Sequence, residues 1–116
     1  SLKAKKKAKK DLEKNIENAQ ELLSSNKTDE FYQKIYGAWI EYLSIKFDLT
    51  IASLNKQTIE NTLEKFAIPN DIISILTKIL EECELAQYAP IPTENAQKTL
   101  LESKTVINDI EEYAKA

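Results

Sequence analysis

The strongest constraint on the fold is the spacing of apolar residues between positions 29 and 49. These residues recur at steps of three to five: Phe31, Ile35, Trp39, Tyr42 and Phe47. Such spacing places side chains on one face of an α-helix. The segment also holds the only Trp of the chain, and aromatic side chains bury the most apolar area. The sequence therefore predicts that this helix is the centre of the core.

The helical period continues in four further segments. Predicted helices cover residues 3–24, about 70–88 and about 93–114, with a shorter helix between Asn55 and Ile68 that turns Ile59, Leu63 and Phe66 inward. Prolines separate the later helices, because a proline disfavours helical geometry in the residue before it. One Gly and three Pro leave few places for hairpin turns. We expect one all-α domain over residues 1–116, a compact bundle of about five helices with a short third helix.

Polar residues beside these segments are expected to cap the helices. The expected caps are Asn26 or Thr28 for the second helix, Ser53 or Asn55 for the third and Thr93 for the fifth. Each offers a side-chain oxygen to the free amides of a first helical turn.

The charges are distributed unevenly along the chain. Six lysines lie within the first ten residues: Lys3, Lys5, Lys6, Lys7, Lys9 and Lys10. The net charge is nevertheless -3, so the remaining residues carry -9. A basic start on an acidic body fits a membrane surface or an acidic partner, and residues 1–11 could project as a lysine-rich helical end. The simpler interpretation is a solvated helix end. The chain has no Arg, which argues against specific nucleic-acid recognition.

Most familiar catalytic arrangements are excluded by composition. Without His the chain cannot form a Ser-His-Asp triad, a histidine-based zinc site or the Glu-x-x-His pairs of di-iron bundles. The only glycine, Gly37, falls inside a predicted helix, so there is no glycine-rich phosphate loop. We expect a protein that is not an enzyme and that holds no cofactor or metal ion.

Two single residues require separate interpretation. Cys83 lies on the apolar face of the fourth helix beside Glu81, Glu82 and Glu84, which favours a buried thiol over a reactive one. One Cys cannot form an internal disulfide, which is usual in reducing compartments. Gly37 marks either a close helix approach or a tolerated glycine.

Several motifs follow one another in a characteristic order along the chain. A lysine-rich helix leads into Asp-Glu-Phe-Tyr at 29–32, then Glu-Tyr-Leu-Ser at 41–44 and Asn-Lys-Gln-Thr-Ile at 55–59. Glu-Glu-Cys-Glu-Leu-Ala-Gln-Tyr-Ala-Pro at 81–90 is the most specific piece. Together these motifs resemble the C-terminal cytoplasmic region of BatD-type proteins of the Bacteroides aerotolerance (Bat) group. The chain departs from that pattern at Leu85 and Gln87, where Phe and Arg are usual.

The resemblance implies a larger, membrane-anchored bacterial protein with this domain on the cytoplasmic side of the inner membrane. The start at Ser1 without Met fits a piece of a longer chain, and the six lysines would then be membrane-proximal. The implied role is that of a non-catalytic scaffold or adaptor for von Willebrand A-domain proteins of the Bat system and a MoxR-type ATPase. No catalytic residue carries over. The candidate partner surface is Glu81, Glu82, Glu84 and Gln87.

An alternative needs no membrane. The same helices could form a free-standing soluble adaptor, either tetratricopeptide-like or a dimerising bundle. A hydrophobic span encoded just before Ser1 would separate the two hypotheses.

Overall fold

A computed structural model describes residues 1–115. The helices are α1 (Leu2–Ser24), α2 (Thr28–Lys46), α3 (Lys56–Lys65), α4 (Asn70–Leu85) and α5 (Thr93–Tyr113), with a 3-10 turn η1 (Ile51–Ser53) before α3. No β-strand occurs within residues 1–115. The prediction of an all-α bundle of five helices with a shorter third helix is therefore confirmed.

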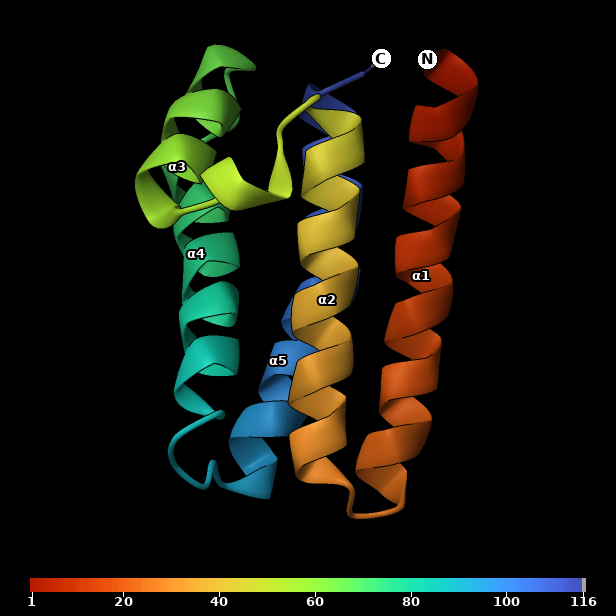
Figure 1. Cartoon of the computed structure of the whole chain (residues 1–116), viewed down its shortest axis with the longest axis vertical. Helices are drawn as coiled ribbons and strands as arrows, with labels where there is room; N and C mark the ends of the chain where they lie inside the picture. Colours follow the sequence, from red (N-terminus) through yellow and green to blue (C-terminus); the bar gives the residue numbers. More distant parts are fainter. Residues whose placement is uncertain (116) are drawn as a thin grey trace.

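The four long helices run alternately down and up (Figure 1). α1 packs along most of α2, α2 packs on α4, α4 on α5, and α5 returns to α1. α2 and α5 are thus diagonal partners that run in the same direction. The short α3 crosses at the end of the bundle where α2 stops and α4 begins, and it packs on α4.

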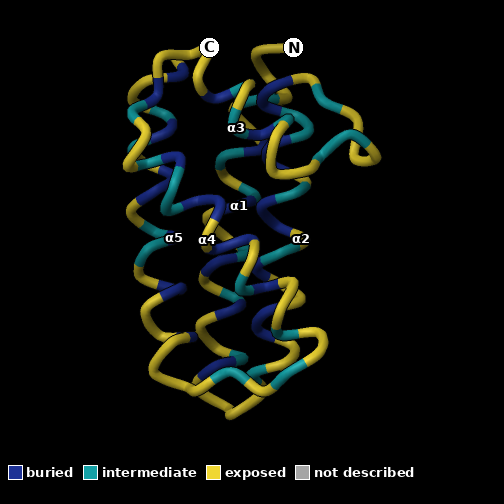
Figure 2. Tube along the Cα trace, turned by 90° about the vertical axis from the view of Figure 1, so that its left-hand side faces the viewer, coloured by how far each residue is buried: buried dark blue, intermediate teal, exposed yellow. Residues whose placement is uncertain are grey.

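The core lies on the axis that the long helices share (Figure 2). Trp39, Phe31 and Ile35 are fully buried, which confirms that α2 carries the aromatic centre of the core. The inward positions of Ile59 and Leu63 are confirmed as well.

The inward position predicted for Phe66 is wrong. Phe66 follows the last residue of α3, and its side chain is 44% exposed. Its ring instead meets Phe47 edge-on, with ring centroids 5.0 Å apart. The ring therefore covers one edge of the core from outside.

Of the N-caps predicted for the second, third and fifth helices, one is confirmed. Asn55 caps α3, because its side-chain oxygen accepts the Thr58 amide at 2.9 Å. Asn26 and Thr28 do not cap α2, whose N-cap is Lys27 without a side-chain bond. Asn26 instead takes a positive φ of 59° in the turn after α1, a conformation that Asn tolerates better than most residues.

The cap of α5 is also different from the prediction. Pro92, with φ of -57°, occupies the N-cap position and Thr93 is already the first helical residue. The prolines at 90 and 92 set the backbone here without a side-chain hydrogen bond.

The lysine-rich start of α1 lies against the bundle. Ala8 and Leu12 are buried, and Lys5 Nζ pairs with Asp48 Oδ2 at 3.4 Å, at the end of α2. None of the helices within residues 1–115 combines the length and the apolar character that a bilayer crossing requires.

Candidate interaction site

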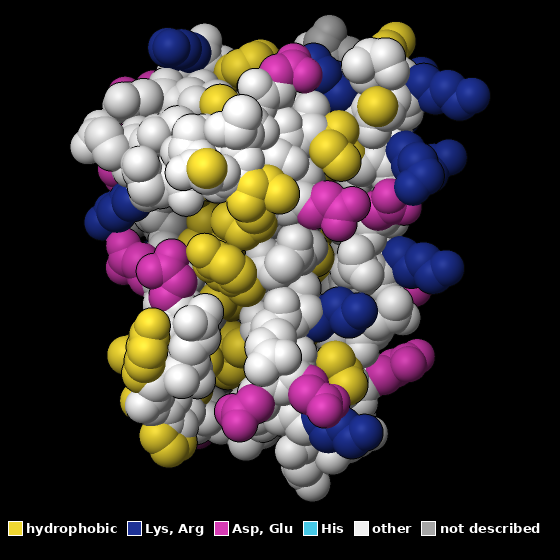
Figure 3. Space-filling model, viewed as in Figure 1, with side chains coloured by type: hydrophobic (Ala, Val, Ile, Leu, Met, Phe, Trp, Pro, Cys, Tyr) yellow, Lys and Arg dark blue, Asp and Glu magenta, His cyan; other side chains and the backbone are white. Residues whose placement is uncertain are grey.

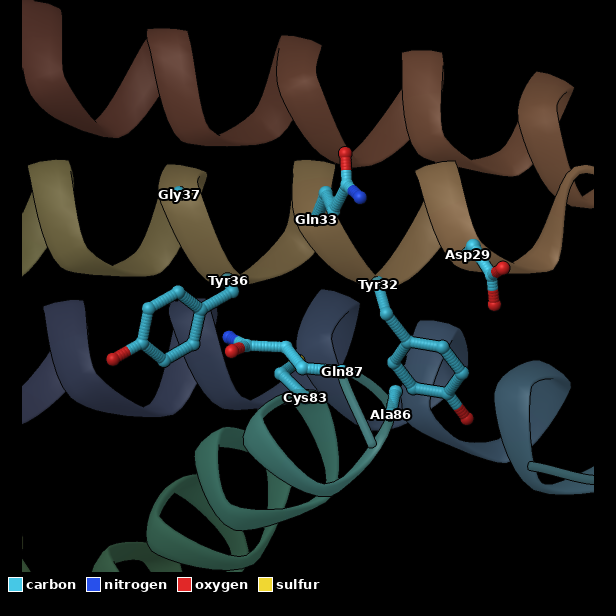
Figure 4. Close-up of a pocket in the computed structure, with 8 residues that line it drawn as sticks. All are labelled: Asp29, Tyr32, Gln33, Tyr36, Gly37, Cys83, Ala86 and Gln87. Atoms are coloured by element: carbon cyan, nitrogen blue, oxygen red, sulfur yellow. The ribbon is translucent and has the colours of Figure 1, made fainter. Parts of the chain in front are cut away.

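A groove of about 270 Å³ runs between the first half of α2 and the C-terminal end of α4 (Figure 4). Its lining residues are Asp29, Tyr32, Gln33, Tyr36 and Gly37 from α2, Cys83 from the end of α4, and Ala86 and Gln87 from the turn that follows α4. The helical repeat of α2 brings its groove residues together. Asp29, Gln33 and Gly37 recur every fourth residue on the outward side of α2. Tyr32 and Tyr36 turn towards α4.

Glu82 of α4, next in sequence to the groove residue Cys83, joins three helices through its hydrogen bonds. Its Oε2 atom accepts a hydrogen bond from the Tyr32 hydroxyl at 2.9 Å and another from the Thr99 hydroxyl. Burial, strengthened by the adjacent Glu82, raises the pKa of Tyr32 well above its ordinary value. Glu82, which the sequence assigned to the partner surface, therefore faces into the bundle and stabilises the fold.

The other predicted surface residues lie on the groove or beside it. Gln87 lies between the rings of Tyr32 and Tyr36 (Figure 4). Glu84 and Glu81 line a smaller hollow of about 30 Å³. Tyr36 lines both this hollow and the groove. Glu81 also pairs with Lys56 of α3 at 3.0 Å.

The charge of Glu84 affects the pKa of Tyr36, the tyrosine that lines both the groove and the smaller hollow. Burial first, and then the charge of Glu84, raises the pKa of Tyr36 above its ordinary value. The Tyr36 hydroxyl is therefore a neutral donor at physiological pH, facing a carboxylate.

Cys83 forms part of the groove floor, and only 2% of it is exposed. Burial, followed by the charges of Glu82 and Glu84, raises its pKa to about 12. A thiol held protonated in this way is a weak nucleophile. The prediction of a buried, apolar role for Cys83 is confirmed.

Gly37 does not mark a close approach between helices of this chain. A Cβ atom built there meets no heavy atom within 4 Å. Gly37 also borders a second hollow of about 600 Å³ on the α1 side of α2, whose lining includes Glu30, Lys34 and Glu41. The outward ridge of α2 is therefore lowest at Gly37, between two hollows.

The predicted membrane-proximal lysines lie away from this site. Lysines form a column along the outer edge of α1 (Figure 3), and the first turns of α1 lie at the opposite end of the bundle from the groove. Lys7 pairs with Asp11 at 2.8 Å within α1. Lys3, Lys6 and Lys10 are exposed, and Lys9 is half-buried.

No group of three or more His, Cys, Asp or Glu residues able to hold a metal ion occurs in the described part of the chain. The sequence prediction missed Gln33 and Tyr36 as groove residues, because it considered only the core-facing side of this segment, to which Tyr32 belongs as a buried residue. The available signal was Gly37 itself, which follows Tyr36 directly and lies one helical turn after Gln33.

Comparisons of this chain with protein-family models, with curated proteins and with solved structures found no match.

Proposed function

We propose that this domain is a non-catalytic protein–protein interaction module of the scaffold or adaptor kind. The observation that carries the proposal is the groove between α2 and α4, which is an open, mixed polar and aromatic surface on a well-packed core. The exposed Gln33 and Gln87 and the half-buried Tyr36 suit such a surface, since aromatic rings supply contact area and amides adapt their hydrogen bonds.

The titratable groups at the groove support binding over turnover. Cys83 stays a protonated thiol, and the Glu82 carboxylate is occupied by two hydroxyl donors. Catalysis needs an activated nucleophile, acid or base. The Cys83 thiol has the opposite character, and both hydrogen bonds to Glu82 come from side chains of the bundle itself.

We further propose that the domain belongs to a BatD-like protein anchored in the bacterial inner membrane, and that it faces the cytoplasm. The segment that resembles BatD proteins most specifically, residues 81–90, forms one wall of the groove. The lysine-rich end of α1 lies at the other end of the bundle, so lipid contact there would leave the groove accessible. The proposed partners are von Willebrand A-domain proteins of the Bat system and a MoxR-type ATPase.

The test uses purified partners and two matched variants. We expect the von Willebrand A-domain or the ATPase encoded beside this gene to bind the domain in isothermal titration calorimetry. Gln33→Arg, which places a long cation in the groove, should weaken binding about tenfold. Gln97→Arg makes the same change at an exposed position of α5 and should leave the affinity unchanged. Binding that Gln33→Arg leaves intact would remove the groove from the proposal.

The gene itself gives a second test. The Bat assignment requires a hydrophobic span encoded shortly before Ser1. A soluble linker at that place, together with a stable dimer in light scattering, would favour the free-standing helical adaptor.

A further inference from the structure

Gly37 lies on the exposed ridge of α2, where it lowers the stability of the helix, and no contact within the chain explains its presence. Glycine in a helix interior is about 1 kcal/mol less favourable than alanine. At Gly37 the chain itself gives no reason for it, because φ is not positive and an added Cβ would lie in open space. Such a position suits the close approach of a second backbone from outside.

The surroundings of Gly37 have the shape of a saddle. One hollow lies towards α4 and the other towards α1, and Gly37 borders both. In Figure 3 both flanks of α2 are visible on the same face of the molecule. An elongated element could therefore cross α2 at Gly37 and place side chains in the hollow on each side.

The charges around this saddle are mainly negative. Asp29, Glu30 and Glu41 line the two hollows, against one lining cation, Lys34, while the charge of Lys7 on α1 reaches Glu41. Within residues 1–115 none of these three carboxylates forms an ion pair. Carboxylates left without partners favour cationic side chains on whatever binds there.

We propose that the α2 saddle, defined as Asp29, Glu30, Gln33, Gly37 and Glu41, binds an amphipathic helix of a partner protein that carries lysine or arginine beside its apolar face. A helix fits better than an extended segment, since the surface is built from helices and offers no strand edge within the described residues. Gly37 allows the two helix axes to come closer than the usual 8–10 Å. This inference rests on the proposed interaction function and names the chemistry of the partner.

The probe is a displayed library of amphipathic helical peptides in which the polar positions vary between lysine, glutamine and glutamate. Selection on the purified domain should enrich lysine-rich helices, with binding that weakens as salt rises. Enrichment of acidic or uncharged helices would overturn the inference. The selected peptide then serves as ligand for the variants.

Gly37→Gln is the central variant. It fills the saddle at an exposed helical position, so the urea midpoint of the free domain should stay equal or rise, while affinity for the selected peptide falls at least about tenfold. Thr105→Gln, at an exposed site on α5, should change neither property by comparison. Unchanged affinity in Gly37→Gln would overturn the inference.

A second pair of variants tests the charges. Asp29→Asn combined with Glu30→Gln should weaken peptide binding and reduce its dependence on salt. Glu64→Gln combined with Glu112→Gln removes the same charge at exposed sites on α3 and α5 and should have no such effect. If the peptide data fail while the purified Bat partners still bind, the saddle inference is wrong and the interaction function stands. If the partners also fail to bind, the proposed function is wrong.

Discussion

The two faces of α2 differ in how completely their polar groups are used. On the inward face, Trp39 Nε1 donates to Ser103 Oγ at 3.1 Å, and Tyr42 and Lys46 both meet the Glu111 carboxylate. No buried side-chain nitrogen or oxygen in residues 1–115 lacks a partner. On the outward face, Gly37 lies in open space between hollows with unpaired carboxylates.

This difference separates, within one helix, the residues that stabilise the fold from those that we propose for recognition. Paired polar groups in a packed interior fix which helices lie together, since an unpaired buried group costs about 1–3 kcal/mol. Ser103, Glu111 and Glu82 set the register of the diagonal α2–α5 contact in this way. The outward face bears no such requirement and is available for a partner.

The largest effect is expected for loss of the central aromatic side chain. Trp39→Ala should lower the free energy of unfolding by about 3–5 kcal/mol, because it leaves a cavity and removes the donor to Ser103. Urea denaturation followed by far-UV circular dichroism measures it. Tyr88→Ala is the control, since Tyr88 is 86% exposed; a similar loss in both variants would contradict the inner-face account.

A smaller loss is expected at the other end of the inward face. Glu111→Leu leaves Lys46, which is 6% exposed, without its partner at 3.3 Å, and should lower the free energy of unfolding by about 3 kcal/mol. Adding Lys46→Met should recover part of that loss, because a buried ion pair replaced by apolar side chains is often neutral. If the double variant loses as much free energy of unfolding as Glu111→Leu and Lys46→Met lose separately in sum, the two residues are not coupled.

Alkaline pH should weaken the inward face next. Burial raises the pKa of Cys83 from 9.0 to about 12 and also raises those of Tyr32 and Tyr42. The unfolded chain therefore loses these protons first. The stability that the protonated forms contribute is complete below pH 9 and is lost as the pH rises towards 12.

The size of this alkaline effect follows from the thiol. Between pH 9 and 10.5 the free energy of unfolding should fall by about 1.5 kcal/mol from Cys83 alone. Urea titrations at pH 7.5, 9 and 10.5 measure the fall, and Cys83→Ala should flatten it. An equally steep fall in that variant would assign the effect to other groups.

The smallest effect has the opposite sign and belongs to the outward face. Gly37→Ala should raise the free energy of unfolding by about 1 kcal/mol, because it improves helix propensity without a clash. The adjacent Ala38→Gly should lower it by at least about 1 kcal/mol, since Ala38 is buried. If both substitutions destabilise, the outward face is under the same packing constraint as the inward face.

The helices could be predicted from apolar periodicity, because Phe31, Ile35 and Trp39 lie on one face only if their segment is helical. Proline supplied the breaks before α4 and α5. Periodicity counts apolar residues only, however, so it missed Thr99 and Ser103, polar residues that are buried because they complete hydrogen bonds from α2.

The groove and the caps were harder to predict for related reasons. Glu82 and Glu84 are only two residues apart in sequence, yet only Glu82 reaches donors on two other helices. This difference depends on tertiary packing. Caps depend on local backbone geometry, and Asn26 takes a left-handed conformation in place of the expected cap. The sequence marks Gly37 as unusual, but only the structure distinguishes open space from close contact at this position.

The most direct measurement is a titration of the ¹⁵N-labelled domain with the selected basic helical peptide, followed by amide chemical shifts. The account predicts that the largest changes occur at Gln33, Gly37 and Gln87, and that Gln97 and Thr105 on α5 stay unchanged. Changes confined to α3 or to the exposed face of α5, with Gly37 unaffected, would contradict the claim that the outward face of α2 is the recognition surface.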